Sequence, residues 1–454
     1  MKHRCTVKRW SWLLGSLLLS SQVQAQTLTE AVTEAVREHP VTRTELSRYQ
    51  QRLEEARAQK GAYLPSVTLE GRTGYGRQES EVEGVDQSSD PHDYQRGSIT
   101  LSQLIWDGNR TVNRIRQAND EADYQRWQTA SAANQIALST VQAYLEVLLN
   151  QQLVELAERN VEQHQRTAAD IRRRSEAGAG TTTDTSQVEG RLARARASLV
   201  AARNNLEDAR SAYIRHVGEA PGQLRLPETV DMTAIPEDLE RVMAMATANN
   251  PLLIATRESV QAAGHEVAAE RGGFLPSFNV EASRLTSRDY DFEGSDADDW
   301  KAELVMRYNL YRGGSDLAEL RARDHALEAV RHDSDRALRE VRDELRLAWN
   351  ARDYLRNQLP YLEQHVDASE QTRTNYRKQF DIGRRTLLDL LDSENEVYDA
   401  RRARLQAEFD LRRARYRLLA VTGQLLDSMR VNVRPSADGT LIARDTPPYR
   451  GEQP

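Results

Sequence analysis

The feature that most constrains the fold of this 454-residue chain is an internal repeat. His39-Pro40 and Asn250-Pro251 each open a helical pattern, and these patterns end at Gly61-Ala-Tyr-Leu-Pro-Ser66 and Gly272-Gly-Phe-Leu-Pro-Ser277. The two halves keep one offset up to this point and a second offset after it, so their length difference is confined to residues 67–103 of the first half. Helical segments of matched length, with variation confined to one segment, indicate a tandem duplication.

The variable segment of each half changes from a helical to an alternating pattern. We expect strands at about 67–76 and 97–105 in the first half and at about 278–287 and 301–310 in the second. Each strand pair flanks an acidic loop, at residues 79–93 and 289–299. The strands are long enough to cross an outer membrane. Two hairpins leave open edges, so a membrane-inserted chain must oligomerise. The alternative is a pair of hairpins that stay in the periplasm.

The helices between these segments are unusually long. Residues 109–175 contain neither Pro nor Gly, which allows a rod of about 100 Å at ~1.5 Å per residue. Apolar and small residues then recur at alternating spacings of four and three, which is typical of a coiled coil. The two seams are Val188, Leu192, Ala195, Leu199, Ala202, Leu206, Ala209 and Tyr213, and Ser393, Val397, Ala400, Arg404, Ala407, Leu411, Ala414 and Leu418.

Each half also contains one sharp turn between two helical runs. A Gly that interrupts a helical pattern is typical of a helix C-terminus, because Gly takes positive φ without strain. A Thr then supplies the N-cap oxygen of the next helix, and an Asp lies in its first turn. We therefore expect two helical-hairpin tips, with Gly178, Thr181 and Asp184 in the first half and Gly383, Thr386 and Asp389 in the second. The second tip also carries Asp392, whereas the first has Gln187 at the matching position.

The ends of the chain differ from the repeat. Residues 1–25 have the basic start, short apolar run and small-residue end of an export signal peptide. The chain's single cysteine, Cys5, lies in this segment, so we expect a mature protein without disulfides. The repeats then cover residues 26–228 and 229–430, and residues 431–454 form a polar tail. The net charge of −7 disfavours nucleic acid as a partner.

No enzyme, metal or cofactor motif is complete in the sequence. His265-Glu266 begins like a zinc-protease helix, but Ala269 stands where the second His is required. The segment from Asp289 resembles the start of a calcium loop, but Trp300 occupies the position of the bidentate carboxylate. The nine His residues show no ligand spacing, and we find no nucleophile–base arrangement. We expect a protein that is not an enzyme and needs no cofactor or metal.

With the repeat, the tips and the hairpins in view, the chain resembles the TolC family of outer-membrane exit ducts over about residues 27–428. The most specific stretch is Gly383-Arg-Arg-Thr-Leu-Leu-Asp-Leu-Leu-Asp392 with the helix after it. Tyr308-Asn-Leu-Tyr-Arg-Gly-Gly-Ser315 and Gln379-Phe-Asp-Ile-Gly383 are most similar to members that export adhesins and agglutination proteins by type I secretion.

The resemblance implies a mainly α fold with a membrane β part. Each chain would carry a tandem repeat of long coiled-coil helices plus two β-hairpins. A homotrimer would form one twelve-stranded β-barrel in the outer-membrane lipid, continued by an α-helical periplasmic tunnel. The implied partners are a periplasmic adaptor protein, an inner-membrane ABC transporter and an exported protein cargo.

The resemblance also assigns roles to residues of the two tips. Asp389 and Asp392 would form the acidic pair that constricts the tunnel, and a threefold axis would gather six such carboxylates, which raises pKa values and attracts cations. Without the resemblance, both could simply occupy a favourable first helical turn. Arg385 and Asp184 fall on positions that link neighbouring coiled coils in the closed state, with Thr183 beside them and Phe380 where relatives often have Tyr. The expected adaptor-docking tips are Ala177, Gly178, Ile382 and Gly383.

The sequence therefore predicts a passive exit duct of an ABC transporter-driven type I secretion system. Two alternatives remain at this point. One is the outer-membrane component of a multidrug (RND-type) efflux pump with the same fold, and the other is a soluble periplasmic coiled-coil scaffold.

Overall fold

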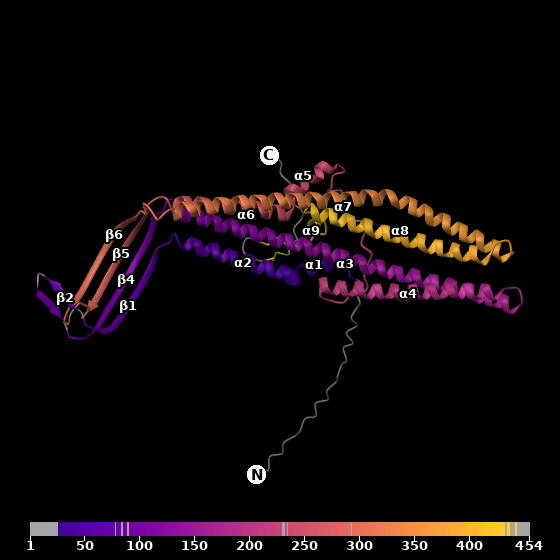
Figure 1. Cartoon of the computed structure of the whole chain (residues 1–454), viewed down its shortest axis with the longest axis horizontal. Coiled ribbons are helices and arrows are strands. Elements are labelled where there is room, and N and C mark those ends of the chain that lie inside the picture. The colour runs from indigo at the N-terminus through magenta and orange to yellow at the C-terminus, as the bar shows by residue number, and fades with distance from the viewer. Residues whose placement is uncertain are drawn as a thin grey trace, which may run out of the picture.

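The computed structural model describes residues 26–77, 79–82, 85–88, 90–228, 232–233, 235–291, 293–431, 434–435 and 441–442. The expected signal peptide and most of the polar tail lie outside these residues. Figure 1 shows a β-sheet at one end of the molecule and long helices that run from it to two tips at the other end.

The two halves have the same order of elements. The first contains α1 (Leu28–Glu38), α2 (Pro40–Gly61), β1 (Ser66–Gly76), β4 (His92–Trp106), α3 (Arg110–Glu176) and α4 (Thr182–Val217). The second contains α5 (Leu239–Asn249), α6 (Pro251–Gly272), β5 (Ser277–Arg288), β6 (Asp296–Arg307), α7 (Ser315–Asp381) and α8 (Leu387–Val421). The helices α2 and α6 both have 22 residues, and α3 and α7 both have 67, which supports the tandem repeat. The remaining elements are β2 (Glu79–Val82), β3 (Val85–Ser88), α9 (Leu425–Ser428), β7 (Arg434–Pro435) and β8 (Leu441–Ile442).

The four main strands form one antiparallel sheet in the order β1-β4-β5-β6. Residues paired directly across neighbouring strands share a face, so Leu69, Ile99 and Trp300 lie on one side of the sheet. Leu101, Val280 and Leu304 lie on this same side, which is apolar and largely exposed in the single chain, with Leu69 and Trp300 each 80% exposed. The opposite side is polar, which is the alternation expected from the sequence.

The strand bounds correct the sequence-based expectation in three places. The strand expected at 97–105 begins at His92, and the strand expected at 301–310 spans Asp296–Arg307. Pairing stops at Arg307 because its partner, Ser277, is the first residue of β5 and follows Pro276, which has no N–H to donate. The acidic segments are not simple loops either, since one contains the β2–β3 hairpin and the last part of the other belongs to β6.

The helices pack through the predicted seams. Val188, Leu192 and Ala195 are buried in α4, and Val397 and Ala400 are buried in α8. A large core lies where α1, α3, α4, α7 and α8 meet near the middle of the molecule, and a smaller one lies toward the tips. In the described part of the chain, no helix is both long enough and apolar enough to span a membrane.

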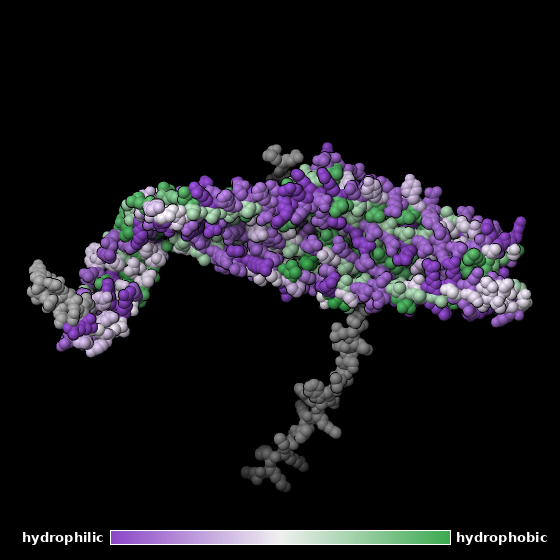
Figure 2. All heavy atoms as spheres, viewed as in Figure 1, coloured by the Kyte–Doolittle hydropathy of each residue, from purple (hydrophilic) through white to green (hydrophobic). Residues whose placement is uncertain are grey.

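Apolar surface also gathers where the sheet joins the helices (Figure 2). Exposed side chains at this junction include Phe274, Leu275 and Leu310, the last 83% exposed. The surface of the helical part is predominantly hydrophilic (Figure 2), in keeping with long helices that bury only narrow stripes.

Candidate gate at the tips of two helical hairpins

Each tip is shaped by a glycine with positive φ. Gly178 has φ 78° and Gly383 has φ 73°. A Cβ at either position would meet nothing within 4 Å, so backbone conformation and not crowding favours glycine there. Main-chain hydrogen bonds close both turns, from Ala179 N to Arg174 O (2.8 Å) and from Arg384 N to Gln379 O (2.8 Å). The expected glycine-terminated helices are confirmed.

The helix that follows each tip starts with a capping box, as expected from the Thr and Asp spacing. In α8 the Thr386 hydroxyl donates to Asp389 Oδ2 (2.8 Å), and Asp389 N–H donates back to Thr386 Oγ1 (3.2 Å). Thr181 and Asp184 form the same arrangement in α4. Hydrogen bonds from Thr386 hold the pKa of Asp389 below its ordinary value, with the nearby Arg385 acting in the same direction. In the single chain Asp389 therefore favours the ionised form.

The second acidic residue, Asp392, connects the two hairpins. Its Oδ1 accepts a hydrogen bond from Arg191 Nη2 of α4 at 2.6 Å. The Asp392 side chain is still 58% exposed, so it remains accessible to water. Asp389 and Asp392 are three residues apart on one helix, which places them on neighbouring parts of one face.

Arg385 does not contact Asp184 within one chain. Its side chain lies over the ring of Tyr376 (4.3 Å to the centroid), donates to Gln379 Oε1 (3.0 Å) and faces Asp389 Oδ2 at 3.7 Å. A contact between Arg385 and Asp184 would have to join two copies of the chain or a different conformation.

The other predicted site residues lie around the same two tips. Phe380 packs partly buried beside the tip core, with the Arg174 guanidinium 4.8 Å from its ring centroid. Thr183 is exposed in the first turn of α4. The expected docking residues are also exposed, and Ile382 is 68% exposed. An open pocket at the second tip includes Ile382, Gly383 and Arg385 among its lining residues.

Sequence reasoning missed the contacts that join the two hairpins near their tips. Arg377 Nη2 donates to Asp170 Oδ2 (2.8 Å), and Arg174 Nη2 donates to Asp381 Oδ1 (3.2 Å). These residues lie in α3 and α7, about two hundred positions apart in the chain. No local pattern marks such pairs, because Arg and Asp are frequent throughout both helices.

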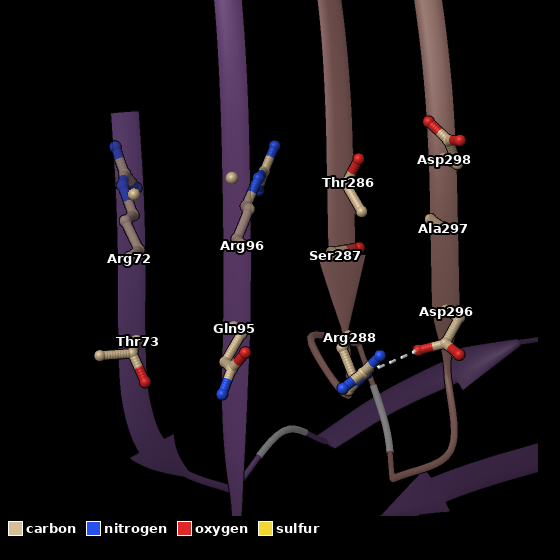
Figure 3. Close-up of a pocket in the computed structure, with 12 residues that line it drawn as sticks. Arg72, Thr73, Gln95, Arg96, Thr286, Ser287, Arg288, Asp296, Ala297 and Asp298 are labelled. Atoms are coloured by element: carbon tan, nitrogen blue, oxygen red, sulfur yellow. Dashed lines mark ion pairs between the residues drawn. The ribbon is translucent and has the colours of Figure 1, made fainter. Parts of the chain in front are cut away.

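A surface pocket at the loop end of the sheet lies far from the tips (Figures 1 and 3). Arg72 and Arg96 are direct cross-strand neighbours there, and Arg288 pairs with Asp296 at 3.8 Å (Figure 3). The pocket opens on the sheet and shares no residue with the tips.

A family model described as "Outer membrane efflux protein" matches residues 32–219 and 242–424. The chain belongs to the outer membrane efflux protein family. Membership confirms the resemblance to the TolC-type ducts. The chain is therefore an outer-membrane channel with its helices in the periplasm, and it is not an enzyme. It also excludes the soluble periplasmic scaffold.

Individual relatives cover nearly the whole chain. It is 27% identical to outer membrane efflux protein BepC of Brucella suis biovar 1, over 91% of this chain and 89% of BepC. It is 25% identical to alkaline protease secretion protein AprF of Pseudomonas aeruginosa, over 91% of this chain and 88% of AprF. The solved structure of VceC from Vibrio cholerae has the same fold, with a TM-score of 0.75, 18% identity, and coverage of 87% of this chain and 96% of VceC.

Proposed function

We propose that three copies of this chain form the exit duct of a type I protein secretion system driven by an inner-membrane ABC transporter. The arrangement of one chain supports a duct, because the apolar sheet lies at one end of a long rod and the acidic tip lies at the other (Figure 1). The secretion role is supported by the likeness to AprF, whose name describes protease secretion. A tandem duplication that covers residues 26–228 and 229–430, preceded by a signal peptide, is part of this proposal.

A drug-efflux duct is the second candidate, favoured by the likeness to BepC, whose name describes efflux. The two candidates predict different losses in cells that lack the protein. If it serves type I secretion, one or a few large proteins disappear from the culture medium, while sensitivity to antibiotics and detergents stays unchanged. Increased drug sensitivity with normal secretion would favour the efflux role instead.

In this duct, Asp389 and Asp392 are the gate. Three copies would bring six carboxylates together at the periplasmic end, where they constrict the tunnel and attract cations. The observation that carries this assignment is that both residues lie on the first turns of α8, directly after the second tip. The tip residues Ala177, Gly178, Ile382 and Gly383 are exposed and would receive the periplasmic adaptor.

The closed state would be held by contacts between copies. Since Arg385 reaches Asp389 and not Asp184 within one chain, we propose that its link to Asp184 and Thr183 forms across the interface between two copies. Phe380 offers no hydroxyl to such a link and instead packs against Arg174.

Replacement of Arg385 tests the gate directly. Arg385→Ser should raise single-channel conductance in planar bilayers several-fold, because one charged contact per interface is lost. Arg331→Ser is the matched control, since Arg331 pairs with Glu328 on an exposed part of α7 far from the tip. An Arg385→Ser channel with the low conductance of the unmodified protein would contradict the gating role.

A further inference from the structure

A buried polar cluster lies a few turns from the gate, where α3, α7 and α8 meet. His164 of α3 is 1% exposed and Glu394 of α8 is 4% exposed. His164 Nδ1 faces Glu394 Oε2 at 3.5 Å, and neither atom has a hydrogen-bond partner among the residues that the structure describes. The two facing atoms are buried without a well-formed hydrogen bond, which is costly, so both side chains are expected to respond to protonation.

The other oxygen of Glu394 is well satisfied. Oε1 accepts hydrogen bonds from Gln163 Nε2 (2.9 Å) and Thr167 Oγ1 (3.2 Å), both on α3. Arg377 of α7 lies 3.9 Å from the same oxygen. Glu394 therefore connects α8, which bears the gate, to the α3–α4 hairpin beside it.

The repeat provides a natural comparison for this cluster. Arg172 and Glu189 occupy the positions in the first half that Arg377 and Glu394 occupy in the second. Arg172 and Glu189 pair at 2.8 Å with both side chains about half exposed, whereas Glu394 is covered by α3. The second half has thus buried a carboxylate that the first half leaves in water.

We propose that His164 and Glu394 form a proton-dependent joint that holds the start of α8 against α3, so that ionisation of either side chain weakens the closed gate. The inference rests on the proposed gating role of Asp389 and Asp392. Both residues lie on the same helix as Glu394, within its first two turns. Any movement that separates the gate carboxylates by shifting α8 away from α3 must break the contacts of Glu394.

The charges around the joint come from every helix packed against it. Arg191 of α4 acts on His164, and Arg373 and Arg377 of α7 act on Glu394. Arg377 is itself bonded to Asp170 of α3 and faces Asp381 of α7 at 3.9 Å.

Burial sets the direction of both titrations. It raises the pKa of Glu394 above its ordinary value near 4.5, against the hydrogen bonds from Gln163 and Thr167. It lowers the pKa of His164 below its ordinary value near 6.5, with the charge of Arg191 acting in the same direction. Both shifts favour the uncharged side chains in the closed joint.

These directions give each side chain its own pH range in which it favours opening of the joint. When the joint opens, both side chains regain water and their ordinary pKa values. From about pH 4.5 upward, until the buried carboxyl also ionises, the released Glu394 loses its proton more readily than the buried one, so rising pH favours opening through Glu394. From about pH 6.5 downward, until the buried imidazole is also protonated, the released His164 binds a proton more readily than the buried one, so falling pH favours opening through His164. Where the two pH ranges overlap, the two effects oppose each other.

The test uses the full-length protein in planar bilayers between about pH 4 and pH 8.5. Each linked proton changes the conductance by at most about tenfold per pH unit, so variants that remove one titrating side chain at a time are compared with the unmodified channel. Glu394→Gln should lose the increase in conductance that rising pH causes from about pH 4.5 upward. His164→Gln should lose the increase that falling pH causes from about pH 6.5 downward. The matched control Glu189→Gln, at the repeat-related position, should keep both.

Hydrogen exchange of the first turns of α8, measured in parallel, separates this inference from the gate assignment. The readout is the protection of these amides relative to their intrinsic exchange rate at each pH. Protection that responds to pH in the unmodified protein and loses its response to rising pH in Glu394→Gln supports the joint. If conductance does not follow this protection, the gate assignment fails. If Glu394→Gln and His164→Gln both keep the pH profile of exchange seen in the unmodified protein, the joint is overturned, whatever the conductance.

Discussion

At the scale of single residues, the most informative side chain is Asp389, because it caps the N-terminus of α8 within a single chain and also lies at the proposed gate. Its carboxylate accepts the hydroxyl hydrogen and the backbone N–H of Thr386 and so completes the capping box of α8. A carboxylate bound in this way has a fixed orientation and a lowered pKa. The local structure thus presents an ionised group at the tip, which is what a cation-attracting constriction requires.

Thr386→Ala should destabilise the N-terminus of α8 and raise the pKa of Asp389 back toward its ordinary value. Loss of an N-cap typically costs about 1 kcal/mol. Because the pKa of Asp389 is lowered in the folded state, its contribution to stability is present above its ordinary pKa near 3.8 and is lost as pH falls below that value. Thr386→Ala should therefore lower the melting temperature near neutral pH and reduce this acid-induced loss, as thermal unfolding followed by circular dichroism would show.

Thr374→Ala is the control for this prediction, because Thr374 is exposed in the interior of α7 and caps no helix. It should leave stability unchanged or slightly increase it, since Ala is the better helix former. Equal losses in Thr386→Ala and Thr374→Ala would show that the capping box contributes nothing.

At the scale of elements, the hairpins depend on seams that are rich in alanine. Ala195 in α4 and Ala400 in α8 are 4% and 2% exposed, and such small side chains let the paired helices approach closely. The two long helices are not identical, since α7 contains Pro360 where α3 has Glu155. Proline removes one helical hydrogen bond and is a common cause of bending, and α7 bends visibly in Figure 1.

Enlarging a seam residue should destabilise the first hairpin. Ala195→Leu adds volume to a closed helix–helix contact and should cost about 1–3 kcal/mol. Ala197→Leu, two positions along the same helix at an exposed site, should change stability by no more than about 0.5 kcal/mol. Chemical unfolding of the two variants decides the matter, and equal stabilities would mean that this seam is not tightly packed.

At the scale of the whole molecule, the sheet explains why one chain is incomplete. Among the described strands, β1 and β6 are each paired on one side only, and one face of the sheet exposes Leu69, Trp300 and Leu304. Unpaired edges and an exposed apolar face are both costly in a monomer. The proposed trimer would pair the edges of neighbouring copies and turn the apolar face toward lipid.

A charge introduced on that face should block assembly. Leu304→Arg should reduce the amount of folded trimer strongly, because an arginine on a lipid-facing strand costs about 2–4 kcal/mol at the middle of the membrane. Val305→Arg is the matched control, because the next residue of the same strand points to the polar face. Gel electrophoresis with and without heating measures the trimer, and normal amounts of Leu304→Arg trimer would contradict the lipid-facing assignment.

The sequence by itself determined the features that arise from local interactions. The repeat, the long helices, the seams and the capped tips all follow from spacing and from residues that contact one another within a few positions. The strand ends do not follow from local sequence, because pairing depends on a partner strand; β6 stops at Arg307 because β5 begins at Ser277.

Only the tertiary structure decided which charged side chains meet and which are buried. Asp392 binds Arg191, Arg385 faces Asp389 of its own hairpin, and Glu394 is buried against His164, whereas its repeat counterpart Glu189 is about half exposed. Of Arg385, Asp392 and Glu394, only Glu394 has the same residue type at its repeat-related position, Glu189. Burial and charge pairing depend on which distant helix packs against each residue: Gln163 and Thr167 of α3 contact Glu394, whereas Glu189 pairs with the half-exposed Arg172.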